Sequence, residues 1–322
     1  MSEHPLLSVQ HLSRRFGQNR AVDDVSFDIH RGEVLGLVGE SGCGKTTVGR
    51  CIIGLTPVTG GQIFFEGTCM AAPRSRVPIQ LGSSRADRIR MADRIQMIFQ
   101  DPLASLDPRM TVREIIAEGL IIRGMRDRRA IENKVNDMLD RVGLDRSFAE
   151  RYPHEFSGGQ RQRIGVARAV ILQPSLIIAD EPVSALDVSV QAQVINLLAD
   201  LRREMGLTVL FVAHDLSVVK YVSDRIGVMY FGKLVELASS EELFRHPLHP
   251  YTQSLLSAIP IPDPAYEKQR QRILYDPAKR HMYTFESPVW QEVAPGHFVL
   301  CNSVELQQYR QDLHNNRRSL LK

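Results

Sequence analysis

The sequence predicts an α/β protein in which helices cover a mostly parallel sheet. In the second half of the chain, apolar segments of strand length alternate with helical patterns, as at Leu176–Ala179, Ser189–Met205 and Thr208–Val212. That alternation is typical of parallel strands joined by crossover helices. In the first half, a strand at Val34–Val38 leads through a glycine-rich loop into a helix at Lys45–Leu55. This is the context of a phosphate-binding loop.

The composition excludes several classes of protein. The 322 residues include 40 Lys+Arg and 37 Asp+Glu, a balance that gives no indication of nucleic-acid binding. Every apolar run is shorter than the ~18 residues of a membrane-spanning helix. The N-terminus has no basic region followed by an apolar core, so we expect no secretory signal. The four cysteines lack C-x-x-C spacing, which favours a reducing compartment without a disulfide framework or zinc site.

The N-terminal stretch has the alternation of a sheet. We expect strands at Leu6–Gln10, Val25–His30 and Glu33–Val38, with Arg31-Gly32 as a hairpin turn between the last two. A polar insert follows at 69–94, before a strand at 95–99. Its arginines are Arg85, Arg88, Arg90 and Arg94. Aspartates interleave with them and aromatic residues do not, so a solvated face is favoured over a nucleic-acid patch.

Residues 101–170 have a helical pattern. Thr111 and Glu114 form a capping box for a helix through Ile122. A second helix is expected at Asp127–Val142, and a third begins near Gly158. Two strands then close the core at 225–230 and 233–237. After residue 240 the sequence predicts a short helix, a Pro-rich linker to Pro264 and a weakly patterned tail.

The glycine-rich loop, G-E-S-G-C-G-K-T, fits the G-x-x-x-x-G-K-[ST] spacing. Backbone N–H groups of such a loop surround the β- and γ-phosphates of a nucleotide. Lys45 adds a point charge, and Thr46 adds a hydroxyl for Mg²⁺. The predicted ATP-binding residues of the loop are Gly39, Glu40, Ser41, Gly42, Cys43, Gly44, Lys45, Thr46 and Thr47. Alkylation of the Cys43 thiol is expected to slow ATP hydrolysis by blocking the loop.

Two further segments carry phosphate chemistry. Asp180 ends an apolar strand at the carboxyl edge of the sheet, where its carboxylate can hold Mg²⁺ through a water. Glu181 is the candidate general base that orients the attacking water. The segment S-G-G-Q, Ser157–Gln160, begins a helix, and its hydroxyl, N–H groups and helix dipole form an anion site.

Together with S-A-L-D at Ser184–Asp187, these motifs identify the chain as resembling the ATP-binding subunit of an ABC transporter. The resemblance implies a P-loop NTPase (ABC ATPase) core with an antiparallel β subdomain, an inserted α-helical subdomain at about 101–170 and a C-terminal extension. The implied nucleotide-binding domain covers residues 1–238, and the extension covers 239–322.

The resemblance also implies roles for residues that are ambiguous alone. Ser157, Gly158, Gly159 and Gln160 would contact the ATP bound to a partner subunit, and Asp187 would lie in a loop between the subunits. Gln100 would sense Mg²⁺ and the attacking water. His214 would hold the γ-phosphate and Glu181 in place, and Phe16 would stack on adenine.

The C-terminal extension and two other segments narrow the resemblance to one group within this family. The segments H-P-L-H-P-Y-T-Q-S-L-L-S-A-I-P at His246–Pro260, D-P-L-A-S-L-D-P-R-M-T-V at Asp101–Val112 and P-G-H-F-V at Pro295–Val299 resemble the oligopeptide and dipeptide importer ATPases. The tail resembles the second, oligopeptide-type subunit. Many such relatives carry a cysteine cluster in this region, whereas this chain has only Cys301 there. A four-thiolate centre needs more ligands, so we expect no iron–sulfur cluster.

The resemblance therefore implies an ATPase subunit, using ATP and Mg²⁺, of an importer for oligopeptides or dipeptides. Its expected partners are two transmembrane permeases, a second and different ATPase chain, and an extracytoplasmic solute-binding protein, without nucleic acid. The expected location is the cytoplasmic face of the cell membrane, through the permeases. Importers of nickel or glutathione remain alternatives, and a soluble ABC ATPase acting on nucleic acid or ribosomes is a further one. A small-molecule kinase would not explain S-G-G-Q or His214.

Overall fold

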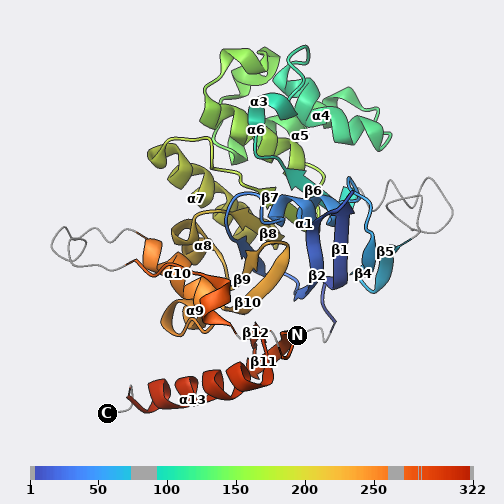
Figure 1. Cartoon of the computed structure of the whole chain (residues 1–322). Coiled ribbons are helices and arrows are strands. Elements are labelled where there is room, and N and C mark those ends of the chain that lie inside the picture. The colour runs from blue at the N-terminus through green and yellow to red at the C-terminus, as the bar shows by residue number, and fades with distance from the viewer. Residues whose placement is uncertain (1–3, 74–92, 260–271, 282, 284, 320–322) are drawn as a thin grey trace.

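The computed structural model describes residues 4–73, 93–259, 272–281, 283 and 285–319, with side chains described to residue 315. Two sheets form the body of the chain, and helices surround the larger one (Figure 1). Arg85, Arg88 and Arg90 of the insert and the linker to Pro264 lie outside the described residues. Arg94 is described, and it forms an ion pair with Glu66.

The smaller sheet is antiparallel, with the strand order β2-β1-β4-β5. Its strands are β1 (Leu7–Phe16), β2 (Asn19–Ile29), β4 (Gly60–Phe65) and β5 (Thr68–Ala71). Apolar residues of this sheet share one core with strand β3 (Val34–Val38) and helix α1 (Lys45–Ile52). The small sheet is therefore packed against the nucleotide-loop side of the large one.

The predicted hairpin at Arg31-Gly32 is wrong. β2 pairs antiparallel with β1, whereas β3 pairs in parallel with β8 and β9 of the other sheet. Every residue of β3 is buried, which suits a central parallel strand and not one arm of a half-exposed hairpin. The turn therefore carries the chain from one sheet to the other.

The larger sheet has the order β11-β12-β10-β9-β3-β8-β7-β6. Its remaining strands are β6 (Ile95–Ile98), β7 (Leu176–Asp180), β8 (Thr208–Ala213), β9 (Arg225–Tyr230), β10 (Lys233–Ser239), β11 (Val289–Ala294) and β12 (His297–Cys301). The pairs from β6 to β9 are parallel, which confirms the predicted α/β fold. The pairs that involve β10 and β12 are antiparallel.

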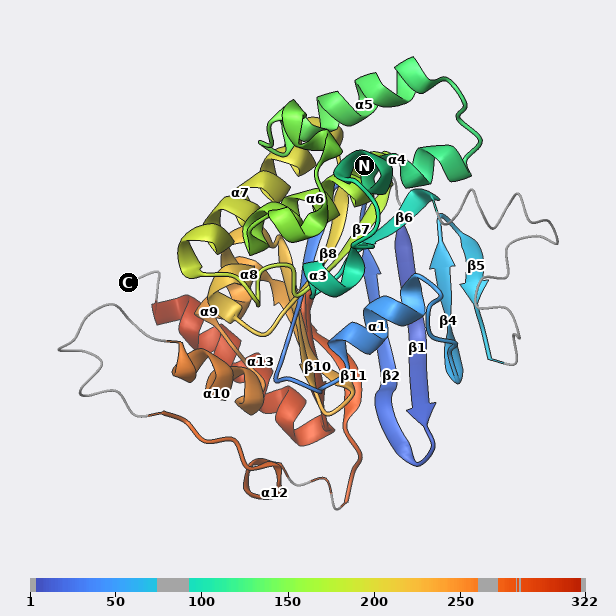
Figure 2. The same ribbon diagram turned by 90° about the horizontal axis from the view of Figure 1, so that it is seen from above.

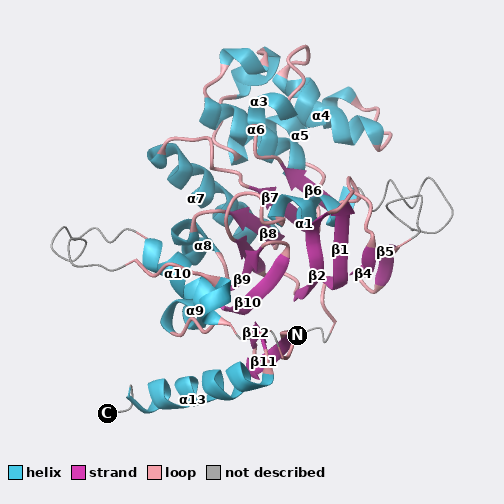
Figure 3. Cartoon of the chain, in the orientation of Figure 1, coloured by secondary structure: helices cyan, strands magenta, loops and turns pink. Residues whose placement is uncertain are grey.

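A group of helices between β6 and β7 lies at one end of the sheets (Figure 3). These are α3 (Pro102–Ser105), α4 (Val112–Ile122), α5 (Arg128–Arg141) and α6 (Gly158–Val170), with short 3-10 turns at Arg146–Glu150 and Pro153–Glu155. The capping box of Thr111 and Glu114 is present at the start of α4. Gly143 ends α5 with a φ of 67°, a left-handed conformation that favours glycine.

Helices also cover the parallel strands and build the C-terminal part. α7 (Val188–Met205) and α8 (Leu216–Val222) follow β7 and β8, and α8 packs on β3 and β8. The C-terminal helices are α9 (Ser240–Arg245), α10 (Pro250–Ala258), α12 (Pro277–Arg280) and α13 (Ser303–Ser319). α9 packs on β9 and β10, whereas α13 packs on β11 and lies below α9 and α10 in Figure 1.

The tail is more ordered than its weak pattern indicates. β11 and β12 form a hairpin, and β12 pairs with β10 through Glu236–Val299 and Leu237–Phe298. A small core of its own lies beneath it, with Leu248, Val293, Val299, Cys301, Tyr309 and Leu313. The hairpin thus extends the large sheet, while the division of the chain at residue 238 stays a prediction.

Candidate nucleotide site

The glycine-rich loop follows β3 and ends at the start of α1. Gly39, Gly42 and Gly44 have φ angles of 150°, 81° and 111°, which L side chains rarely adopt. A Cβ at Gly39 would lie 2.2 Å from the Met229 carbonyl oxygen. A Cβ at Gly44 would lie 2.2 Å from that of Ala21. Glycine is therefore required at both positions, because β2 and β9 approach the loop closely.

Lys45 holds the beginning of the same loop. Its side chain is buried, and Nζ donates to the carbonyl oxygens of Gly39 at 2.8 Å and Glu40 at 2.9 Å. Neutral carbonyls accept these bonds, so they leave the ammonium charge without a neutralising anion. An unneutralised buried cation attracts a phosphate group.

Thr46 and Asp180 meet at the other end of the loop. The Thr46 hydroxyl donates to Oδ1 of Asp180 at 2.8 Å. Burial raises the pKa of the Asp180 carboxyl, and the Thr46 hydroxyl, Arg50 and Lys45 oppose that shift. A hydroxyl and a carboxylate side by side are oxygen donors of the kind that Mg²⁺ prefers, and Mg²⁺ commonly uses only one or two protein carboxylates. The pair therefore fits this ion, and no group of three or more His, Cys, Asp or Glu metal donors occurs among the described residues.

Glu181 lies between residues that follow the two neighbouring strands. Its Oε2 accepts a hydrogen bond from Nε2 of Gln100 at 2.8 Å and lies 3.5 Å from Nδ1 of His214. β6, β7 and β8 are adjacent parallel strands, so their carboxyl ends bring these three side chains together. A small cavity of about 40 Å³ is lined by Glu181, His214 and Ser184, which is room for a water molecule.

The backbone of Glu181 is strained. Its φ is 45°, in the left-handed region that non-glycine residues seldom occupy. Three hydrogen bonds hold it there: its N–H donates to the Val212 carbonyl at 2.9 Å, and its own carbonyl accepts the Ser184 hydroxyl at 3.1 Å and the Ser184 N–H at 3.3 Å. Strain of this kind is maintained only where the surroundings fix it, as at functional sites.

The S-G-G-Q segment begins α6. The Ser157 hydroxyl accepts the Gln160 N–H at 3.3 Å, and Oε1 of Gln160 accepts the Ser157 N–H at 3.0 Å. Ser157 and Gly158 are exposed, as is Asp187 at the start of α7. In both Figure 1 and Figure 2 the helix α6 lies apart from α1. The structure thus groups the loop with Asp180 and Glu181 but leaves the S-G-G-Q segment outside that group.

Phe16 ends β1, and 49% of it is exposed. The guanidinium carbon of Arg14 lies 4.3 Å from the centre of its ring, so one face of the ring is already stacked. Any aromatic ligand therefore meets the other face or displaces Arg14.

Comparison with known proteins identifies the family of the chain. A model described as "ABC transporter" matches residues 22–184, and one described as "Oligopeptide/dipeptide transporter, C-terminal region" matches residues 235–284. The oligopeptide transport ATP-binding protein OppF of Bacillus subtilis is 55% identical over 94% of this chain and 98% of its own length. The chain belongs to the ABC transporter ATPase family.

Other relatives agree with this assignment. AmiF of Streptococcus pneumoniae, an oligopeptide transport ATP-binding protein, is 51% identical over 98% of this chain and all of its own length. DppF of Lactococcus lactis, a dipeptide transport ATP-binding protein, is 50% identical over 92% of each chain. This ABC ATPase is thus a nucleotide-binding enzyme of a family whose members act with membrane-spanning permeases.

Solved structures confirm the P-loop NTPase fold. cbiO1 of Clostridium perfringens, part of the ABC transporter complex cbiONQ, aligns with a TM-score of 0.65 at 25% identity, covering 75% of this chain and 91% of its own. The dimeric ATP-binding cassette MJ0796, in a post-hydrolysis state with ADP and phosphate, aligns with a TM-score of 0.63 at 26% identity over 73% and 98%. Within the described part of this ABC ATPase, no helix has the length and apolar character needed to cross a bilayer.

Sequence reasoning missed several residues at the site. Arg50 and Phe99 line a groove of about 380 Å³ together with Gln100 and Asp180, and neither had a motif to mark it. Tyr251, from α10 in the extension, accepts a hydrogen bond from the Glu40 N–H in the glycine-rich loop at 3.2 Å. Its place in the H-P-L-H-P-Y-T segment indicated a family, but it gave no sign of this contact.

The four cysteines of the ABC ATPase form no disulfide bonds. Burial raises the pKa of the Cys43 thiol, and its Sγ lies 3.7 Å from Nζ of Lys45. Because thiolate is the reactive form, alkylation of Cys43 is expected to be slow, and its effect on hydrolysis stays a prediction. Cys301 is buried in β12. The absence of an iron–sulfur cluster also stays a prediction.

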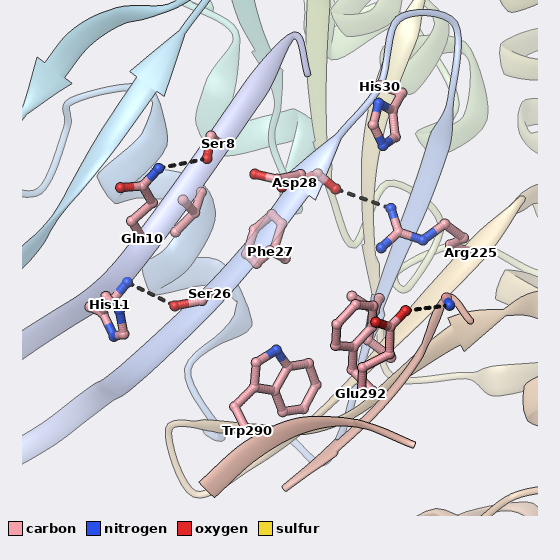
Figure 4. A pocket seen from close by; sticks show the side chains of 14 residues that line it. Ser8, Gln10, His11, Ser26, Phe27, Asp28, His30, Arg225, Trp290 and Glu292 are labelled. Carbon is pink, nitrogen blue, oxygen red and sulfur yellow. Dashed lines mark hydrogen bonds between the residues drawn. The ribbon is translucent and has the colours of Figure 1, made fainter. Parts of the chain in front are cut away.

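A separate pocket of about 550 Å³ lies between the small sheet and the β11–β12 hairpin (Figure 4). Trp290 and Phe298 of the hairpin stack with ring centres 6.0 Å apart. Arg225 on the opposite side donates to the Asp28 carbonyl at 3.2 Å and pairs with Glu33 at 3.1 Å. None of its lining residues belongs to the nucleotide site.

Proposed function

We propose that this ABC ATPase is the ATP-hydrolysing subunit of an importer for oligopeptides or dipeptides. The observation that carries the hydrolytic role is the meeting of Gln100, Glu181 and His214 at the ends of β6, β7 and β8, beside the Thr46–Asp180 pair. The peptide class is supported by the relatives, which are named for oligopeptide and dipeptide transport, and by the matching C-terminal region.

ATP binding is assigned to the loop from Gly39 to Thr47. Its N–H groups would donate to the phosphates, and Lys45 would exchange its carbonyl acceptors for phosphate oxygens. Phe16 would stack on the adenine ring with its free face. Thr46, Asp180 and Gln100 would hold Mg²⁺, which supplies positive charge to the β- and γ-phosphate oxygens when bound.

Hydrolysis is assigned to Glu181 as general base. Its carboxylate would accept a proton from the water that attacks the γ-phosphorus. The Gln100 amide donates to Oε2 of the carboxylate, and Nδ1 of His214 lies 3.5 Å from the same oxygen, so both would orient the carboxylate. The strained φ of Glu181 sets the direction of the side chain at the strand end.

The S-G-G-Q segment would serve the ATP of a second chain. The exposed Ser157 hydroxyl and the N–H groups of Gly158 and Gly159 form an anion site at the start of α6. Asp187 would lie at the contact between the chains. We propose a second ATPase chain of different sequence, two ATPs between the chains, and closure driven by ATP binding and opening by hydrolysis.

The helices between residues 101 and 170 would receive a cytoplasmic helix of each of two permeases. The groove lined by Phe99, Gln100 and Ala104 joins these helices to Asp180, so motion at the nucleotide can reach it. The assembly would lie at the cytoplasmic face of the cell membrane, with an extracytoplasmic protein delivering the solute. No nucleic acid takes part in this proposal.

Affinity purification of the tagged chain from detergent-solubilised native membranes, paired with uptake of labelled peptides, tests the proposal. Two permeases and a second ATPase should copurify, and deletion of the gene should abolish uptake of tri- to pentapeptides or dipeptides. Loss of nickel or glutathione uptake with normal peptide uptake would overturn the peptide class. Recovery with ribosomes or DNA would overturn the transport role.

A further inference from the structure

We propose that Tyr251 of the C-terminal extension is a positioning residue for the phosphate loop, and that it thereby makes ATP affinity depend on the extension. The inference rests on the proposed ATP-binding role of residues 39–47. The observation that supports the inference is the hydrogen bond from the Glu40 N–H to the Tyr251 hydroxyl oxygen at 3.2 Å. It joins residues 211 positions apart in the sequence.

The Tyr251 hydroxyl is placed with little freedom. The residue is 2% exposed, and its ring packs at 4.4 Å from the Tyr230 ring and 5.4 Å from the Tyr275 ring, between centres. Burial raises the pKa of the Tyr251 hydroxyl, so it stays protonated at physiological pH. A neutral, fixed hydroxyl is a steady acceptor for one backbone N–H.

The helix that carries Tyr251 is itself anchored in the large sheet. Glu236 of β10 is fully buried, and its two carboxylate oxygens accept the N–H groups of Leu248 at 2.8 Å and His249 at 3.0 Å. Nδ1 of His249 then accepts the Tyr251 N–H at 3.1 Å, which caps α10. His297 of the hairpin also lies 2.8 Å from Glu236. A continuous set of bonds therefore runs from the hairpin to the phosphate loop.

Tyr251 and Lys45 hold the same two residues of the loop in different ways. Lys45 bonds to the carbonyls of Gly39 and Glu40, and these bonds compete with its proposed bonds to phosphate. The Tyr251 bond uses the Glu40 N–H and no donor of the Lys45 side chain. It therefore does not compete with the proposed bonds from Lys45 to phosphate, and it keeps the first turn of the loop in a binding conformation.

Removing the hydroxyl alone tests this role. Tyr251→Phe in the full chain should raise the Kd for MgATP, measured by titration calorimetry, and the KM of hydrolysis by about three- to tenfold, the effect of one lost hydrogen bond. The kcat should stay within about twofold, because Glu181, Gln100 and His214 are untouched. The Glu40 amide should also exchange with solvent faster.

Tyr275→Phe is the matched control. It removes a hydroxyl from the same aromatic cluster, where the Tyr275 hydroxyl bonds Nε2 of His281 at 2.9 Å instead of the loop. Unchanged Kd, KM and Glu40 exchange in Tyr251→Phe would overturn the inference. An equal rise in both variants would also overturn it, because a general softening of the extension would then be the cause.

Lys45→Ala separates this inference from the proposed function. If Lys45→Ala loses MgATP binding while Tyr251→Phe binds like the parent, only the positioning role fails. If Lys45→Ala binds MgATP normally, the ATP site is not this loop, and both proposals fail. A rise in Kd for Tyr251→Phe together with loss of binding in Lys45→Ala supports both.

Discussion

The carboxylates of Glu236 and Glu181 in this ABC ATPase differ in how many hydrogen bonds they accept. Glu236 is fully buried, and its carboxylate has three partners: the N–H groups of Leu248 and His249, and Nε2 of His297. Glu181 receives one hydrogen bond, from Gln100, and lies 3.5 Å from His214. Its backbone is strained, with a φ of 45°.

The difference distinguishes a carboxylate that stabilises the fold, Glu236, from the proposed general base, Glu181. A fully buried carboxylate with three hydrogen-bond partners stabilises the fold and is closed to a ligand from solvent. A partly paired carboxylate beside a small cavity keeps lone pairs for a water and its proton. We therefore expect substitutions at Glu181 to change the reaction, and substitutions at Glu236 to change the stability.

The largest effect is expected for Glu181→Gln. ATP hydrolysis should fall roughly a hundredfold or more while MgATP binding is retained, because the base is lost and the loop is intact. Steady-state assays measure the rate of ATP hydrolysis, and titration calorimetry measures MgATP binding. The exposed Glu292→Gln, on the β11–β12 hairpin, is the control. Turnover near the parent rate in Glu181→Gln would remove Glu181 from the role of general base.

Glu236→Gln should give the opposite pattern. An amide nitrogen would face one of the two N–H donors from Leu248 and His249, so the free energy of unfolding should fall by about 3 kcal/mol. The kcat of the folded fraction should stay within about twofold. Denaturant unfolding compares Glu236→Gln with the control Glu292→Gln, whose free energy of unfolding should change little. Equal stability of the two variants would show that Glu236 is not a structural centre.

Ser157 sharpens the comparison, because it caps a helix and is also assigned to a partner's ATP. Ser157→Ala should cost about 1 kcal/mol of stability and lower hydrolysis in the assembled transporter about tenfold, by the loss of one bond to a charged phosphate. Thr111→Ala removes an equivalent cap from α4 and is the matched control. Equal losses of activity in both variants would leave Ser157 with a structural role only.

The last prediction concerns His249, beside Glu236. Burial, with His281 nearby, lowers the pKa of His249 to about 3, whereas the unfolded chain binds a proton near 6.5. Below 6.5 the unfolded state gains the proton first, so stability should fall by about 1.4 kcal/mol between pH 7.5 and 5.5. His249→Asn keeps a cap acceptor and removes the titration. Its loss over this pH range should be smaller, and an equal loss would contradict the assignment.

Much of the candidate nucleotide site could be predicted from the sequence because its motifs are local. The glycine-rich loop, the end of β7 and the start of α6 are each short motifs in a recognisable strand or helix context. The capping box at Thr111 and the end of α5 at Gly143 are local as well. Such features depend on neighbouring residues, so the order of the residues is enough to predict them.

The errors arose where partners are distant in the chain. Arg31-Gly32 has the residues of a hairpin turn, but the pairing of β3 with β8 and β9 decided which sheet it enters. The hairpin at β11–β12 was missed because its alternation is weak, and its pairing with β10 supplies what the pattern lacks. Neither outcome can be obtained from a local pattern, because strand pairing is set by contacts across the sheet.

The sequence by itself determined the family, and it predicted the phosphate chemistry and the residues that would carry it, since each rests on a short segment. Only the tertiary structure decided that Glu181 lies near both Gln100 and His214, that Glu236 has three hydrogen-bond partners, and that Tyr251 bonds to the phosphate loop. These contacts join residues brought together by packing of the sheet and its helices. The residues in these contacts are distant in sequence, so the contacts cannot be predicted from the spacing of residues along the chain.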